Sequence, residues 1–217
     1  MKRLLAVVNT ENPKHPAIDL ALNLLSTEGG TLDIVTTIPR VSPLLLSIWS
    51  GHNREFEREF LIDKQTRLNE VVSSLDVKNI TMNSYVLHGR SFVEIVELAN
   101  KNRVDMVLSD DSIDMDESGA SVQGATNFQL LRRCLQPVWL VNSRRSIVPA
   151  KIVAAIDVED THLENMQLNS KILSTALDLS KRFGAQLEVV HAWELFGESI
   201  IIRKFGIGEA DKERSIY

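Results

Sequence analysis

The sequence predicts an α/β protein with a parallel sheet, and two patterns carry this prediction. The apolar run without alternation over residues 4–8 is typical of a strand buried on both faces of a parallel sheet, and residues 104–108 are predicted to be another buried strand. Segments with apolar residues at helical spacing stand between these runs, so strands and helices alternate along the chain. Residues 151–191 then repeat the pattern with which the chain begins, which indicates a second copy of the same unit.

The first strand, helix and strand follow one another over the first 38 residues. Residues 4–8 form the first apolar run. Pro16 suits the first position of a helix, and an apolar stripe follows it until Gly29 and Gly30 end the helix. Residues 32–38 are predicted to form the second strand.

A long amphipathic helix, a third strand and a capped helix come next. Apolar residues recur at helical spacing over residues 56–75, with charges between them. Residues 80–87 have the pattern of a strand. Residues 91–94 read Ser-Phe-Val-Glu, a capping box in which Ser91 caps a helix that runs through Ala99.

The last elements of the first domain end at an apolar strand. Residues 104–108 are predicted to be the fourth strand, and residues 109–123 a loop. A helix around residues 127–135 then leads to a strand over Val138–Val141. The elements up to this point alternate as expected for an α/β domain.

The repeat defines the domain organisation. Residues 151–157 parallel residues 3–9, at an offset of 152 − 4 = 148 residues. We therefore expect a first domain over residues 1–143, a linker over residues 144–150 and an incomplete second domain over residues 151–217.

The second copy is expected to stop about halfway. A helix ending at Gly184 and a strand over residues 187–191 complete a strand-helix-strand unit, and a full copy would end near residue 2 × 148 = 296. Such a unit leaves part of its apolar surface uncovered, at about 1.5–3 kcal/mol for each large side chain. We expect it to dock on the first domain or on another chain, and we favour a truncated form of a tandem protein.

Composition excludes several classes of function. The chain has 24 Lys and Arg against 29 Asp and Glu, a net charge of −5, and its basic residues form only scattered doublets. A nucleic-acid surface needs clustered basic residues, so we expect no nucleic-acid partner. The apolar run after Lys2 and Arg3 is too short for a signal peptide, and no apolar stretch is long enough to span a membrane. Cys134 is the single cysteine of the sequence and cannot form an internal disulfide. We therefore expect a cytoplasmic protein with no membrane partner.

The fourth strand and the end of the first domain resemble the universal stress protein family. Residues 104–108 read Val-Asp-Met-Val-Leu, residues 124–126 Gly-Ala-Thr, and residues 130–141 Leu-Leu-Arg-Arg-Cys-Leu-Gln-Pro-Val-Trp-Leu-Val. The second copy is similar to the tandem branch of that family. The resemblance implies a five-stranded sheet of order 3-2-1-4-5. It also implies pairing of domains through the edge strand Val138–Val141, and hence a homodimer or another association.

ATP-binding members of that family carry an Asp at the end of the first strand and a loop of pattern G-x2-G-x9-G-[ST] after the fourth. Here the first strand ends in Asn9, and Asp110, Asp111 or Asp114 stands where glycine belongs. A carboxylate ~4 Å from a phosphate charge costs about 4 kcal/mol, more than the ~1.5–3 kcal/mol that one charge-assisted hydrogen bond returns. We therefore expect no ATP in the first domain. The second copy keeps Asp157 at the base-binding position. The family pocket positions, which we take as candidate ligand-binding residues, are Asn9, Gly89, Ser109, Gly124 and Thr126.

Two other acidic patterns fall short of a site. Asp114, Asp116 and Ser118 fit the first half of a calcium loop, but Ala125 stands at the position that needs a bidentate Glu. Asp110 follows a buried strand, as a phosphoacceptor does in receiver domains, but the first strand is not followed by an acidic pair and the last strand does not end in Lys.

No residues are arranged as nucleophile, base and orienting group. The five histidines lack ligand spacing, and Ser91 is better explained as a helix cap than as a nucleophile. We expect a non-catalytic stress-response protein that acts by ligand or protein association, with no metal and no cofactor. The alternatives are an ATP-binding switch with weak hydrolysis, and a binding module for another small ligand at the carboxyl ends of the strands.

Overall fold

The computed structural model describes residues 1–39, 53–75, 77–110, 122–142, 144, 146–159 and 162–191. The chain divides into two compact units, Met1–Val148 and Pro149–Tyr217.

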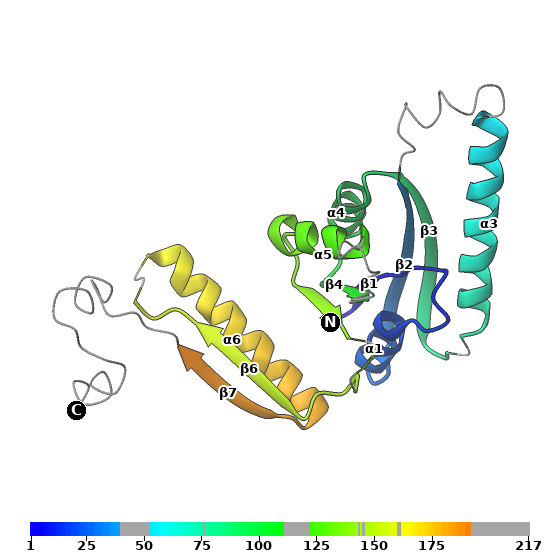
Figure 1. Ribbon diagram of the computed structural model, residues 1–217. Helices are drawn as coiled ribbons and strands as arrows, with labels where there is room; N and C mark the ends of the chain where they lie inside the picture. The colour runs from blue at the N-terminus through cyan, green and yellow to red at the C-terminus, as the bar shows by residue number, and fades with distance from the viewer. Residues whose placement is uncertain are drawn as a thin grey trace, which may run out of the picture. The chain divides into compact units, whose positions relative to one another are not determined.

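The first unit is an α/β domain with one parallel sheet (Figure 1). The strand order is β3-β2-β1-β4-β5, which confirms the predicted fold class and topology. Its elements are β1 (Arg3–Val7), α1 (Pro16–Leu25), β2 (Gly30–Pro39), α3 (Asn53–Ser73), β3 (Ile80–Gly89), α4 (Ser91–Asn102), β4 (Met106–Asp110), α5 (Val122–Arg133) and β5 (Val138–Val141).

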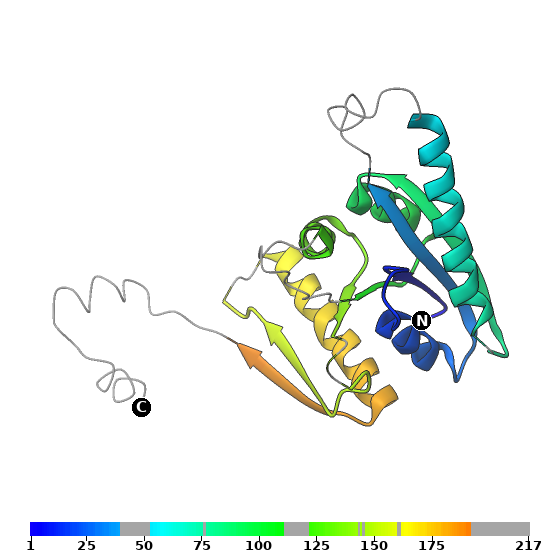
Figure 2. The same cartoon turned by 45° about the vertical axis from the view of Figure 1, so that its right-hand side comes forward.

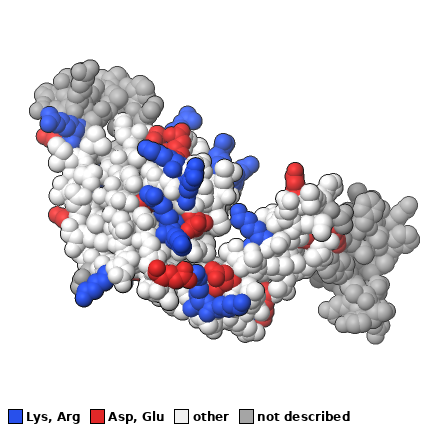
Figure 3. All heavy atoms as spheres, turned by 180° about the vertical axis from the view of Figure 1, so that it is seen from behind, with Lys and Arg blue, Asp and Glu red and all other residues white. Residues whose placement is uncertain are grey.

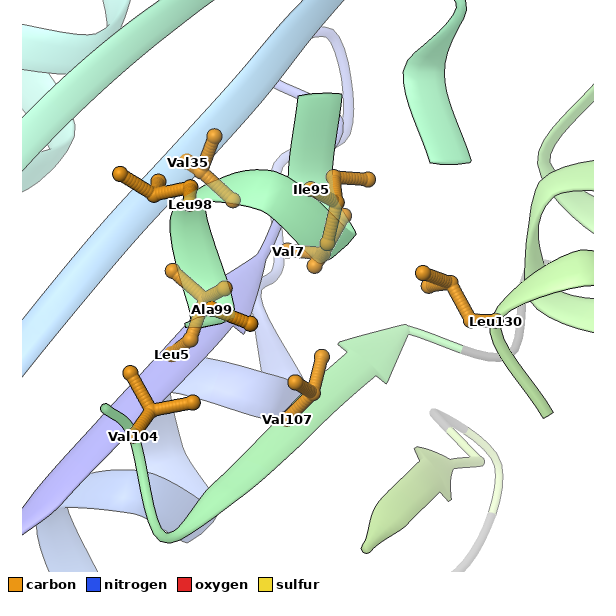
Figure 4. Close-up of a cluster of buried hydrophobic side chains, with 9 residues drawn as sticks. All are labelled: Leu5, Val7, Val35, Ile95, Leu98, Ala99, Val104, Val107 and Leu130. Carbon is orange, nitrogen blue, oxygen red and sulfur yellow. The ribbon is translucent and has the colours of Figure 1, made fainter. Parts of the chain in front are cut away.

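Helices cover both faces of this sheet. Figures 1 and 2 show α4 and α5 side by side, and α3 running along β2 and β3. Between α4, α5 and the sheet lies a buried apolar core (Figure 4), in which Leu5 and Val7 of β1 point to the same side. Because side chains alternate along a strand, Leu4 and Ala6 face the other side, where α1 packs on β1 and β4. The residues of the core cluster are Leu5, Val7, Val35, Ile95, Leu98, Ala99, Val104, Val107 and Leu130.

The fourth strand lies two residues further along than the apolar pattern indicates. Arg103 adopts a left-handed conformation that ends α4, and the Val104 N–H group donates to the Ala99 carbonyl. Asp105 is also engaged, because its carboxylate accepts the N–H groups of Lys2 and Arg3. Pairing within the strand therefore begins at Met106 and continues to Asp110.

The capping-box interpretation of Ser91 is wrong. The N-cap of α4 is Arg90, which makes no side-chain capping bond, and Ser91 is the first helical residue. The Ser91 hydroxyl instead accepts a hydrogen bond from Thr37 Oγ1 at 2.8 Å, which ties the start of α4 to β2. The Glu94 carboxyl group lies against Gly89, the last residue of β3.

The second unit is a strand-helix-strand arrangement. β6 (Lys151–Ile156) and β7 (Gln186–His191) form a two-stranded parallel sheet, and α6 (Leu163–Phe183) connects them. As expected, α6 ends at Gly184, which has φ +63 and donates its N–H group to the Ser180 carbonyl. Within this unit Val153, Val189 and Val190 are 54%, 52% and 42% exposed.

The described helices include none that is both long and apolar enough to cross a bilayer. Figure 3 shows acidic and basic side chains interspersed on the face it presents. Asp114, Asp116 and Ser118, on which the calcium-loop pattern rests, lie outside the described residues, as does Asp111 of the phosphate-loop comparison.

Candidate functional site

The candidate site lies at the carboxyl ends of β1 and β4. The strand order reverses between these two neighbours, and parallel sheets place ligands at such a switch point. We use the name strand-end site for the polar residues gathered there from β4, from the loop between β1 and α1, and from α5. They are Thr10, His15, Ser109, Asp110 and Asn127.

Asp110 is the central residue of this site. It is 4% exposed, and its Oδ1 accepts the Ala17 N–H group at 2.8 Å. Pro16 has no N–H group, so Asp110 satisfies a main-chain donor in the first turn of α1. Burial raises the pKa of Asp110 to about 6; the Ala17 N–H group opposes this rise, and the charge of Asp19 adds to it.

Three buried polar side-chain atoms around the start of α1 lack a hydrogen-bond partner. They are Thr10 Oγ1, His15 Nδ1 and Asp110 Oδ2, and the described part of the chain has no other such atom. Burial also lowers the pKa of His15, against the charge of Asp19, which favours the neutral imidazole. An unpaired buried polar atom costs about 1–3 kcal/mol, so three in one region make it the candidate site of this unit.

Ser109 and Asn127 join β4 to α5. Ser109 is fully buried, and its hydroxyl group donates to Asn127 Oδ1 at 2.7 Å. The Asn127 amide group in turn donates to the Asp110 carbonyl at 3.0 Å. These bonds fix the end of β4 against the second turn of α5.

Four of the five family pocket positions belong to the segments that form the strand-end site, namely the loop after β1, β4 and α5. Asn9 follows β1 directly, where its Oδ1 accepts the Glu11 N–H group at 3.1 Å. Ser109 lies opposite Val7 in the β1–β4 register, and Gly124 and Thr126 are on α5, exposed and buried respectively. Gly89 lies at the end of β3, which β2 separates from β1.

Sequence reasoning missed a buried cation close to this region. Lys64 of α3 has a side chain only 8% exposed, and its Nζ lies 2.6 Å from Glu11 Oε1. The ammonium group also lies 5.5 Å from the centre of the Phe60 ring. The hydrogen bond from Lys64 and its charge lower the pKa of Glu11. In the sequence, Lys64 is one of many charges on an amphipathic helix, and nothing local indicates that it is buried.

These features define a doubly wound α/β protein with a buried carboxylate at its switch point. No family model matches the chain. The chain is 22% identical over 183 residues to universal stress protein E of Escherichia coli (strain K12), an alignment that covers 83% of this chain and 58% of that protein. Universal stress protein E of Salmonella typhi is 23% identical, over 83% of this chain and 58% of that protein. The chain therefore spans 58% of the length of the curated relatives it matches.

Solved structures show the same fold. A proposed universal stress protein from Pseudomonas aeruginosa UCBPP-PA14 superposes with a TM-score of 0.63 at 17% identity, covering 97% of this chain and 72% of its own. Hypothetical protein MJ0577 superposes with a TM-score of 0.51 at 12% identity, covering 67% of this chain and 98% of its own. The curated relatives confirm the predicted resemblance to the universal stress protein family, and the solved structures confirm the fold.

Proposed function

We propose that this chain acts in the stress response by binding a ligand or a protein partner in the cytoplasm, without catalysis and without holding ATP in its first unit. The similarity to universal stress protein E supports the stress-response role. The buried carboxyl group of Asp110, which accepts the Ala17 N–H group, is the observation that carries the rest.

Asp110 opposes the binding of a nucleotide phosphate. Its carboxylate already takes the Ala17 N–H group that a bound anion would need, and it places negative charge at the start of α1. At ~4 Å and an effective dielectric constant of ~20, two like charges repel by about 4 kcal/mol, nearly three decades in affinity. A glycine at this position would leave the main-chain N–H group open to the ligand.

The hydrogen bonds of the site also favour a binding role over catalysis. The Ser109 hydroxyl group donates to an amide oxygen, which is too weak a base to activate a nucleophile. Asp110 Oδ1 is held by a main-chain N–H group. The described residues contain no group of three or more His, Cys, Asp or Glu side chains that could hold a metal ion.

The edge strand β5 supports the proposal of a homodimer. Among the described strands, β5 pairs only with β4, and its four residues Val138–Val141 carry no charge. An edge strand without charged side chains can pair with another chain. The exposed Val153 and Val190 of β6 and β7 support association through the second unit as well.

Calorimetric titration of the whole chain with ATP and Mg²⁺ at pH 7.5 tests the first part of this proposal. We expect no saturable binding below millimolar ATP for the wild type, and measurable binding for Asp110→Gly. Saturable micromolar binding by the wild type would overturn the proposal in favour of an ATP-binding switch. Light scattering over a concentration series tests the second part, and a monomer at every concentration would contradict association.

A further inference from the structure

We propose that Asp110 is a proton-operated gate for anions at the start of α1: when ionised it excludes them from the strand-end site, and when protonated it admits them. This inference rests on the proposed function, in which the ionised carboxylate keeps phosphate out. It adds a condition under which that exclusion ends.

The geometry leaves the charge on Asp110 poorly stabilised. The buried carboxylate accepts one main-chain N–H group through Oδ1, and Oδ2 has no partner. Asp105 provides a comparison in the same chain. Burial acts to raise its pKa too, but the N–H groups of Lys2 and Arg3, at 2.5 and 3.0 Å from Oδ2, together with the positive charges of the N-terminus and Lys2, outweigh burial and hold the pKa below its ordinary value. Asp110 has one N–H donor, and no positive charge acts on its pKa.

The groups that face Asp110 do not compensate its charge. On α1, Asp19 repels it and His15 is held towards its neutral form. In the loop after β1, Thr10 is uncharged and Glu11 is paired with Lys64.

The two elements on the other side of Asp110 add no charge either. From α5, Asn127 donates only to the main-chain oxygen of Asp110, and β5 presents Val141 in register with it. Within the described residues, Asp110 forms no ion pair, so protonation is its main route to neutrality.

The size of the effect follows from the titration of Asp110. Because burial raises its pKa to about 6, roughly one molecule in 30 carries the protonated carboxyl group at pH 7.5, and about nine in ten carry it at pH 5. If only the protonated form binds, the apparent affinity for an anion falls with that fraction. We expect anion affinity to rise roughly 30-fold from pH 7.5 to pH 5.

Inorganic sulfate is the probe of choice, because its charge stays constant over this pH range whereas that of phosphate changes. The Ala17 amide signal in ¹⁵N NMR spectra of the whole chain reports binding at the start of α1. We expect sulfate to shift this signal with a dissociation constant about 30-fold lower at pH 5 than at pH 7.5. In Asp110→Asn we expect binding at both values with little dependence on pH. Asp19→Asn is the matched control, since it removes an equal charge from an exposed position on the same helix and should keep the pH dependence.

Three results would overturn the gate. One is wild-type sulfate affinity that does not change with pH, or no sulfate binding at pH 5. Another is a full pH dependence in Asp110→Asn, which would assign the effect to His15. The third result comes from the wild type and is decisive if Asp110→Asn does not fold. The Asp110 carboxyl ¹³C signal must titrate with the same midpoint pH as sulfate binding, and a different midpoint refutes the gate. ATP binding by the wild type at pH 7.5 would instead refute the proposed function.

Discussion

Replacing Asp33 by alanine should be among the most destabilising single changes in the first unit. Asp33 lies in β2, fully buried, and its carboxylate accepts four hydrogen bonds. Arg3 donates two of them, from Nε at 2.8 Å and from an Nη group at 3.1 Å. Asn83 and Asn102 donate the others at 2.8 and 2.9 Å. The substitution would leave all these donors without their acceptor.

The loss of stability expected for Asp33→Ala depends on how far the side chains that pair with Asp33 are exposed to solvent. Removing one member of a buried ion pair costs about 3–5 kcal/mol, mainly through the charge left behind. The side chain of Arg3 is 34% exposed, so its guanidinium group can regain water, and we expect the lower end, about 3 kcal/mol. The chain provides a matched control in Asp63→Ala. Asp63 Oδ2 lies 2.9 Å from Arg67 Nε, as Asp33 Oδ2 lies 2.8 Å from Arg3 Nε, but both side chains of the control pair are about half exposed. An exposed pair of this kind contributes about 0.5 kcal/mol.

Native-state amide exchange of β1 and β2, read by NMR, is the appropriate assay. The chain contains two units, so a bulk unfolding curve would mix their transitions. The difference between the two variants, about 2.5 kcal/mol, corresponds to roughly 60-fold faster exchange in Asp33→Ala than in Asp63→Ala. Equal exchange in the two variants would refute the argument that burial decides the value of this ion pair.

Three further changes test other parts of the structure. Because burial raises the pKa of Asp110 from 3.8 to about 6, the native state binds this proton more tightly than the unfolded state does. The free energy of unfolding of the first unit should therefore fall by about 3 kcal/mol as the pH rises from 3.8 through about 6. Asp110→Asn should abolish this pH dependence in urea titrations followed by NMR. Glu11→Gln leaves the buried ammonium group of Lys64 without its counter-charge. Urea titration should show that the free energy of unfolding falls by about 1–3 kcal/mol. An unchanged midpoint would mean that solvent replaces Glu11. Gly30→Ala would push a Cβ atom into the main-chain carbonyl of Lys2 and should prevent stable folding of the first unit. At Gly184 the added Cβ atom meets open space, so Gly184→Ala should cost only about 1 kcal/mol, measured by amide exchange. Equal costs for the two variants would contradict the steric argument.

The fold was predictable because its signals are local. The apolar runs of β1 and β4 carry no alternation, and both strands are buried on both faces in the sheet. The helix stop at Gly184 was equally clear, since its left-handed conformation suits glycine. Ser91 misled the prediction because its hydroxyl group found a partner on another strand, and no local pattern encodes that contact.

The candidate site was predictable only in part, for the same physical reason. That Asn9 and Ser109 lie at the same edge of the sheet follows from topology, because the carboxyl ends of neighbouring parallel strands share one edge. The bond between Asp110 and Ala17 spans 93 residues of sequence, and the burial of Lys64 depends on how α3 lies against the loop after β1. Both are consequences of long-range packing.

Asp110 gives the start of α1 an internal partner in place of an external one. Where glycine follows a strand in this position, the main-chain N–H groups nearby need a ligand or water, and a bound anion then adds to the stability of the fold. Here the ionised Asp110 carboxylate accepts the Ala17 N–H group, so in that state helix α1 does not depend on a ligand for its first turn. The arrangement is costly, because Oδ2 is buried without a partner. A carboxyl group held in this way is more useful as a group that changes its charge than as a simple helix cap, since an N-cap residue such as Ser or Asn would satisfy the same N–H group without burying a charge.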